Sequence, residues 1–179
     1  MTVSIRNMTQ DDVSAVANIH VKGWQEAYGG IVDADYLSNL SVSEKEESWT
    51  LWLQDEGVHH IVAEQDNKVL GFLSVGPLRT LPPGMSPIRP LYATEIYAVY
   101  LDPDYYRQGI GRTLFSEAAK RIVEMKQQST CLWVMDKNER GNRFYKALGG
   151  ERCGKNFVEV GPSKIKDVCY GWRDIKSFI

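Results

Sequence analysis

The chain has 179 residues, of which 43% are hydrophobic and 25% are charged, enough for one compact domain with a buried core and too few for a second of similar size. Its formal net charge of −2 lacks the basic excess typical of nucleic-acid binding. No apolar run approaches the roughly 20 residues of a membrane span, and the first residues lack the charged-then-apolar order of a signal peptide. We therefore expect a single domain over residues 1–179 in the cytoplasm, with neither nucleic acid nor membrane as a partner.

The first third of the chain predicts one short strand and then helices. Residues 3–6 favour a strand, and Thr9 is placed to cap a helix that Gly29 and Gly30 end. The apolar residues of that helix recur at helical spacing: Val13, Val16, Ile19 and Trp24. Residues 33–54 carry apolar positions among charges, which indicates one or two further helices with a break at 41–43.

The middle of the chain predicts strands. Residues 59–65 and 68–76 flank Asp66 and Asn67, and short polar residues at such a turn favour a β-hairpin. The segment 77–90 holds five of the chain's seven prolines, so we expect a loop there. Residues 92–101, YATEIYAVYL, are apolar on both faces, as in a central strand.

The last third alternates between the two kinds of element. Helical spacing predicts helices over 111–126 and over 138–148, with a strand at 130–136 between them. Two final strands are predicted, near 157–160 and 167–172.

Cysteine and histidine give no sign of a metal site. Cys131, Cys153 and Cys169 are odd in number, widely spaced and set among apolar neighbours, which predicts reduced, buried thiols. Two of the three histidines are adjacent and the third is distant, whereas a metal site needs clustered ligands. We therefore assign no metal.

The most informative stretch is AVYLDPDYYRQGIGRTLFSEAAKRI, in which a strand passes through a glycine loop into a helix. The first N–H groups of a helix have no partner inside it, and the helix dipole favours negative charge at that end. Gly109 and Gly111 would let a bulky anion approach the backbone, and Arg107 and Arg112 could add charge-assisted contacts. The loop therefore predicts a phosphate-bearing ligand. It matches neither the dinucleotide fingerprint nor the phosphate loop of nucleotide hydrolases.

Residues 95–122, together with LWVMDKNERGNRFYKALGGE, resemble the acyl-coenzyme A binding core of the GNAT N-acetyltransferase superfamily. The resemblance implies an α/β (α+β) fold whose mixed, mostly antiparallel sheet of about seven strands is flanked by helices. It also implies acetyl-coenzyme A as the cosubstrate, without a metal. The family has Gln or Arg where this chain has Tyr106, alanine where it has Gly141, and an aromatic residue where it has Gly150.

The resemblance assigns most of the cofactor contacts. The strand before the loop would bind the pantetheine arm through its backbone, and the loop amides would hold the pyrophosphate. Asn138 would contact the pantetheine, with Asn142 on the same helical side. The residues so assigned are Val99, Tyr100, Leu101, Arg107, Gln108, Gly109, Ile110, Gly111, Arg112, Asn138 and Asn142.

Acyl transfer to an amine needs a base, a polarised carbonyl and a proton for the leaving thiolate. Glu95, a carboxylate in an apolar strand, is the candidate base and would share a face with Tyr97 and Val99 by two-residue alternation. The alternative is that Glu95 lies in solvent or pairs with a nearby Arg or Lys. The resemblance places Tyr145 beside the thioester sulfur as general acid; otherwise it is a packing aromatic. A strand N–H near Val99 would polarise the carbonyl.

Tyr28 and Tyr97 are expected to bind the acceptor, since aromatic residues can wall a pocket for an amine. We predict an acyltransferase that moves an acetyl group from acetyl-coenzyme A to a primary amine of a small molecule by direct, ternary-complex attack. Two alternatives remain: a protein N-terminal or lysine acetyltransferase, and a noncatalytic acyl-coenzyme A binding sensor. The sequence leaves the oligomeric state open, a homodimer included.

Overall fold

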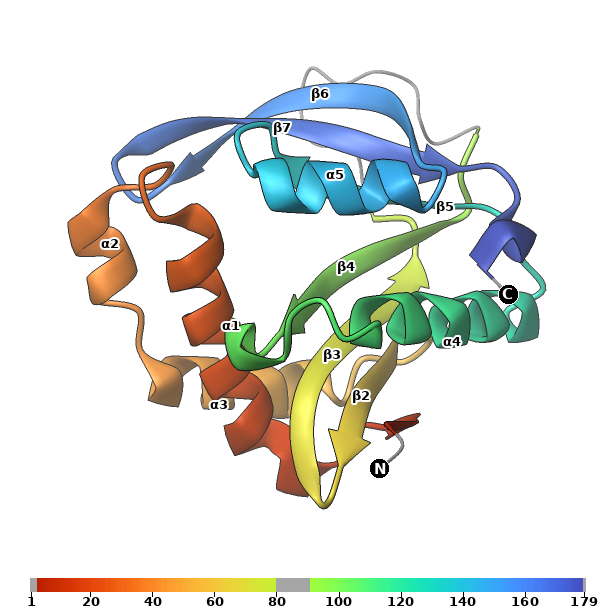
Figure 1. The fold of residues 1–179 in the computed structure, drawn as a ribbon, viewed down its shortest axis with the longest axis horizontal. Coiled ribbons are helices and arrows are strands. Elements are labelled where there is room, and N and C mark those ends of the chain that lie inside the picture. The colour runs from red at the N-terminus through yellow and green to blue at the C-terminus, as the bar shows by residue number, and fades with distance from the viewer. Residues whose placement is uncertain (1–2, 80–90, 179) are drawn as a thin grey trace.

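The computed structural model describes residues 3–79 and 91–178, and Figure 1 shows their arrangement. Most of the predicted proline-rich loop, residues 80–90, lies outside this described part. The strands and helices follow one another as β1 (Ser4–Asn7), α1 (Val13–Tyr28), α2 (Ala34–Ser38), α3 (Val42–Trp52), β2 (His59–Gln65), β3 (Lys68–Pro77), β4 (Thr94–Leu101), α4 (Ile110–Glu124), β5 (Thr130–Met135), α5 (Glu139–Ala147), β6 (Glu151–Val160) and β7 (Ser163–Trp172), with 3-10 turns η1 (Gln10–Asp12), η2 (Pro103–Tyr105) and η3 (Ile175–Phe178).

The seven strands form one sheet in the order β1-β2-β3-β4-β5-β7-β6. In the part of the chain that the structure describes, five of the neighbouring pairs are antiparallel, and only β4 and β5 run parallel. The α/β (α+β) class and the mixed, mostly antiparallel sheet flanked by helices are therefore confirmed. The single parallel pair lies at the centre of the sheet, which is where the glycine loop leaves β4.

Local sequence accounts for the early elements. Asp66 and Asn67 take positive φ values of 53° and 62°, which suits a two-residue hairpin turn and confirms that prediction. Helix α1 begins at Val13, later than expected from a Thr9 cap, because Gln10–Asp12 first forms a 3-10 turn. Ser41 accepts a hydrogen bond from the Glu44 N–H at 3.3 Å and so starts α3 after the predicted break.

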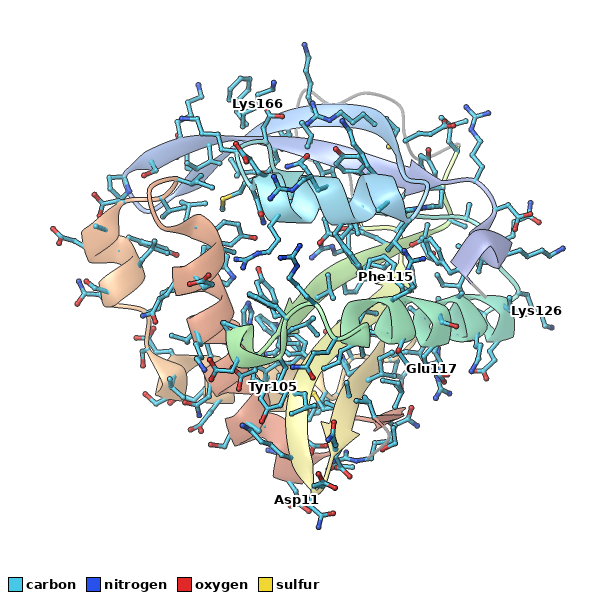
Figure 2. All side chains as sticks on the ribbon, in the orientation of Figure 1. Asp11, Tyr105, Phe115, Glu117, Lys126 and Lys166 are labelled. Carbon is cyan, nitrogen blue, oxygen red and sulfur yellow. The ribbon has the colours of Figure 1, made fainter. Side chains whose placement is uncertain are left out.

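Helices cover both faces of the sheet. On one face α4 and α5 enclose an apolar cluster around Phe115, which contacts Phe144, Trp172 and Phe178 with ring centroids 5.5 to 6.0 Å apart. Figure 2 shows Phe115 between α4 and α5, whereas Glu117 lies on the outer side of α4. On the other face α1 and α3 pack over β2 and β3. The two clusters pack against opposite faces of the central strands.

The last hairpin is longer than predicted. Strands β6 and β7 have ten residues each, whereas the sequence indicated only their C-terminal parts. Strand β6 forms the sheet edge and is largely exposed at alternate positions, so its polar residues hide the strand signal. In β7 the early part alternates lysines with Ile165 and Asp167 for the same reason.

The three cysteines are free, as predicted, and Cys131 and Cys169 are buried. Cys153 is only half-buried, because the register of β6 against β7 shifts between Arg152 and Gly154 at the sheet edge. Widely spaced in sequence, the thiols gather on the face that also holds Tyr92. Within the described residues, no three His, Cys, Asp or Glu side chains are placed to share a metal ion.

None of the helices in the described ranges combines the length and the hydropathy of a membrane-spanning segment.

Candidate active site

The central parallel strands separate soon after they meet. β4 pairs with β5 only at Thr94–Thr130 and Glu95–Cys131, while it remains paired with β3 as far as Leu101. From Ile96 onwards the β4 backbone groups on the β5 side therefore lack strand partners. Buried N–H and C=O groups need partners, so this edge is suited to an extended ligand that carries amides.

A bulge in β4 sets the direction of its side chains. Ser74 pairs with Ala98 and Val75 with Ile96, so Tyr97 is an extra residue that opposes none on β3. Val99 consequently packs with Ile96 in the cluster under α4. Glu95, next to Ile96, faces the other way. The prediction that Glu95, Tyr97 and Val99 share one face by simple alternation is therefore wrong, because the bulge shifts the alternation.

A cavity of about 440 Å³ fills the gap between the two strands. Its walls come from β4, β5, the loop before α4, the start of α5 and the end of α1. Twelve of the predicted site residues line it: Tyr28, Tyr97, Val99, Tyr100, Leu101, Arg107, Gly109, Ile110, Gly111, Arg112, Asn138 and Tyr145. The cavity also has lining residues that the sequence did not single out: Gly23, Ala27, Trp133, Arg140 and Phe144. Tyr106, where the chain departs from the family pattern, lines it as well.

Backbone donors gather at the start of α4. The first helical bond runs from the Thr113 N–H to the Gly109 carbonyl at 3.1 Å, so the N–H groups of Ile110, Gly111 and Arg112 have no partner within the helix. Gly109 is the N-cap at φ 84°, and a Cβ there would meet no atom within 4 Å. Position 109 therefore needs glycine because the backbone is left-handed there, not because a side chain would clash.

Gly111 is required for a different reason. A Cβ at this position would lie 3.1 Å from the Phe144 ring, so the missing side chain lets α4 pack closely against α5. The sequence suggested ligand approach as the purpose of both glycines. Packing between the helices is the constraint that the structure adds for Gly111.

Three arginines line the cavity. Arg107 and Arg112 lie exposed beside the loop amides. Arg140, in the first turn of α5, stacks its guanidinium 4.3 Å from the Tyr106 ring centroid and pairs with Glu26 at 3.4 Å. Guanidinium groups bind phosphate oxygens well. Arg140 had no sequence signal, because only the fold brings α5 opposite the loop.

Gln108 and Asn142 do not line the cavity. Gln108 is exposed, and its side chain lies outside the walls. Asn142 is buried with both ends of its amide engaged: Nδ2 donates to the Asn138 carbonyl at 2.7 Å, and Oδ1 accepts from the Tyr170 hydroxyl at 2.9 Å. These contacts tie the start of α5 to the sheet.

The departures of α5 from the family pattern have packing causes. Asn138 caps α5 by accepting a hydrogen bond from the Gly141 N–H at 3.0 Å, and a Cβ at Gly141 would lie 3.0 Å from the Asn138 Nδ2. A Cβ at Gly150 would come within 2.6 Å of the Trp172 ring. Trp172 therefore occupies the space that an aromatic residue at position 150 would need.

Tyr145 lies in the wall of the cavity and is 9% exposed. Burial raises the pKa of its phenol, and nearby Tyr28 raises it further. The Tyr28 hydroxyl lies 3.3 Å from that of Tyr100. Three phenols from α1, β4 and α5 thus converge at the cavity, and a phenol with a raised pKa keeps its proton at neutral pH.

Glu95 is buried, with 4% exposure, and its carboxylate is held by Arg79. The Arg79 Nε donates to Glu95 Oε1 at 3.0 Å, its backbone N–H donates to Oε2 at 3.3 Å, and its guanidinium stacks 4.3 Å from the Tyr97 ring centroid. Arg79 is therefore the nearby cation with which the alternative interpretation paired Glu95. Glu95 lies where β4 and β5 begin to separate, outside the residues that line the cavity.

A sheet that opens between its two parallel strands, beside an arginine-lined helix start, defines a protein that can hold an elongated anionic ligand at its centre. Sequence comparison gives the class. The Acetyltransferase (GNAT) family matches residues 24–149, and the chain belongs to this family of acyltransferases.

Relatives agree with this assignment. The chain is 31% identical to the "Uncharacterized N-acetyltransferase YuaI" of Bacillus subtilis over 98% of this chain and 95% of the relative. It is 28% identical to a spermidine N(1)-acetyltransferase of Thermoplasma acidophilum over 81% of this chain and 86% of the relative.

Solved structures show the same fold. The PaiA N-acetyltransferase of Thermoplasma acidophilum, crystallised with coenzyme A, matches with a TM-score of 0.69 at 21% identity over 93% of this chain and 98% of that one. The ribosomal-protein-alanine N-acetyltransferase of Brucella melitensis matches with a TM-score of 0.72 at 22% identity over 94% and 98%.

Proposed function

We propose that this chain transfers the acetyl group of acetyl-coenzyme A to a primary amine of a small molecule by direct attack within a ternary complex. The observation that carries the proposal is the unpaired β4 edge, which leads from the donor groups at the start of α4 towards Tyr145. Its length and chemistry suit a ligand with phosphates at one end and amides along an arm. Coenzyme A in the PaiA structure supports this choice.

The residues fit that ligand. The N–H groups of Ile110, Gly111 and Arg112 would bind the pyrophosphate, with charge from Arg107 and Arg140. The backbone of β4 from Val99 to Leu101 would pair with the pantetheine amides as a strand would. Asn138, whose Oδ1 is used as a helix cap, would contact the arm through its Nδ2.

Bound acetyl-coenzyme A supplies a thioester with a leaving thiolate. As the C–N bond forms and the C–S bond breaks, the Tyr145 hydroxyl donates its proton to the departing sulfur. A backbone N–H of β4 near Val99 would polarise the carbonyl oxygen. Glu95 would receive the proton of the amine through a water molecule, and its ion pair with Arg79 would hold the carboxylate in place.

A small acceptor is favoured over a peptide by the acceptor side of the cavity. Tyr28, which is buried, and Tyr100, which is half-buried, form the wall on that side next to α1. A peptide substrate would need an open groove there. The name of the Thermoplasma acidophilum relative, a spermidine acetyltransferase, supports the same choice.

The test combines binding and turnover. Saturating acetyl-coenzyme A should raise the melting temperature, because a ligand that binds only the folded state stabilises it. Release of coenzyme A should then follow the addition of small primary amines. Binding without thiol release across an amine panel would favour the noncatalytic sensor, and release only with peptides would favour a protein acetyltransferase.

Gly109→Ala provides a matched control for the binding site. A Cβ meets no neighbour there but strains the left-handed backbone, so the acetyl-coenzyme A affinity should fall. Gly57→Ala places the same strain in a distant turn and should leave the affinity unchanged.

A further inference from the structure

Asp167 lies on the face of β7 that packs against the end of α1, outside the residues that line the cavity. It pairs with Met135 of β5 on one side and Asn156 of β6 on the other. Ile165, two residues earlier on the same face, is buried in a cluster with Met135 and Tyr28. Asp167 therefore points toward α1 from among apolar neighbours and is half-buried.

Among residues 3–79 and 91–178, no side chain or backbone group makes a hydrogen bond or ion pair with the Asp167 carboxylate. Its Oδ1 is buried without a hydrogen bond, and no ion pair joins it to any Lys or Arg of the described ranges. The adjacent Lys166 instead pairs with Asp136 at 3.0 Å. Burial raises the pKa of Asp167 to about 6. An unpaired buried carboxylate is unfavourable for folding, and such groups are more frequent at binding sites than elsewhere.

Packing leads from Asp167 back to the cavity, because its neighbours Ile165 and Met135 pack with Tyr28, and Tyr28 lines the cavity together with Tyr145. Burial raises the pKa of Tyr28, and the Asp167 charge raises it further. Tyr28 in turn adds to the effect of burial in raising the pKa of Tyr145. Asp167 is not among the residues that line the cavity, and Tyr28, which packs with Ile165 and Met135, connects it to the cavity.

That position suits a charge other than the reacting nitrogen. The attacking amine must be neutral and adjacent to the thioester, near Tyr145. A second ammonium group on the same molecule would reach past Tyr28 to the unpaired carboxylate of Asp167. The rings of Trp24 and Tyr28 also lie on this side and contact each other edge-on, with their centroids 4.9 Å apart. Aromatic faces and a carboxylate together favour a primary ammonium group.

We infer that Asp167 is the anionic subsite for a second positive charge on the acceptor, so that the acceptor is a diamine or a larger amine with a second ammonium group. This inference rests on the proposed function, because it concerns the substrate of the same site. It defines a specificity residue and adds no step to the transfer.

The experiment compares two acceptors of equal length, diaminobutane and aminobutanol, which differ only in the second charge. The protein as purified should prefer the diamine at least about tenfold in kcat/KM. Asp167→Asn should abolish that preference by raising KM for the diamine, with aminobutanol changed less than about twofold. Glu159→Gln, which removes an exposed carboxylate from β6, should retain the preference.

A binding measurement separates this inference from the proposed function. With coenzyme A bound, the diamine should raise the melting temperature of the unaltered protein and leave that of Asp167→Asn unchanged. Equal use of both acceptors by the unaltered protein, or an equal loss for both in Asp167→Asn, would overturn the subsite. If no amine at all is acetylated, the proposed function fails; a diamine shift that depends on Asp167 would then still support a cation site, and its absence would remove that as well.

Discussion

Replacing Asp167 by asparagine should make the free protein more stable at neutral pH. The pKa of the carboxyl rises from 3.8 to about 6 on folding because of burial. Each pKa unit corresponds to about 1.36 kcal/mol, so ionisation of Asp167 opposes folding by at most about 3 kcal/mol above pH 6. The side chain is partly exposed, and screening by water reduces the expected gain for Asp167→Asn to about 1 to 2 kcal/mol.

The pH dependence of this gain follows from its sign. The unfolded chain ionises Asp167 near pH 4 and the folded chain only near pH 6, so raising the pH through this window favours unfolding. The facing groups, Tyr28 on α1 and Asn156 on β6, stay neutral throughout. Asp167→Asn should therefore gain stability between pH 4 and pH 6, keep the full gain above pH 6, and show none below pH 4.

Urea unfolding at pH 7.5 and at pH 4.5 measures this difference directly. Glu159→Gln is the control and should change the free energy of unfolding by less than about 0.5 kcal/mol. A variant no more stable than the unaltered protein at pH 7.5, or one with the same gain at both pH values, would refute the argument that Asp167 is an unpaired, desolvated charge.

Three further changes test other parts of the site. Tyr145→Phe should lower kcat by about 100-fold while leaving the acetyl-coenzyme A affinity nearly unchanged, and an unaltered rate would remove its acid role. Arg79→Gln should destabilise the fold by about 1 to 3 kcal/mol, because it leaves the buried charge of Glu95 unpaired. Glu95→Gln leaves no buried charge and should destabilise the fold less. A larger loss for Glu95→Gln in urea unfolding would count against the ion pair between Arg79 and Glu95. Burial lowers the pKa of His20 to about 3, so the free energy of unfolding should fall as the pH drops below 6.5. His20→Gln should lose less stability over the same pH range. An equal loss in both proteins would show that His20 does not titrate this way.

Local signals predicted most of the fold. The hairpin at Asp66 and Asn67 depends on two adjacent residues that accept positive φ, and the loop at Gly109 depends on one glycine and the helix that follows it. Each of these features depends on residues that are close together in the sequence, so the local residue pattern is enough to predict it. The family resemblance then supplied the mixed, mostly antiparallel sheet of about seven strands, which local patterns cannot provide.

The features missed by the sequence depend on residues that only the fold brings together. The extra residue at Tyr97 appears only in the register of β4 against β3, and it reverses the face of Val99. Arg79 reaches Glu95 from the adjacent strand end. Asn142 has the spacing of a ligand contact, yet Tyr170 from β7 occupies its amide.

Asp167 was missed for the opposite reason, because what distinguishes it is a missing partner. In the sequence it follows Lys166, and the two would pass for an ordinary solvated pair. The fold turns Lys166 toward Asp136, and Figure 2 shows Lys166 beside α5. A side chain's lack of a counter-ion can be recognised only once every neighbour has been placed.

The most direct test of the central claim is amide hydrogen exchange with and without saturating coenzyme A. The account predicts strong protection of the amides at the start of α4, residues 109–112, and along the open edge of β4, residues 97–101. Tight binding that leaves these amides exchanging at their unliganded rates, with protection elsewhere on the sheet, would contradict it.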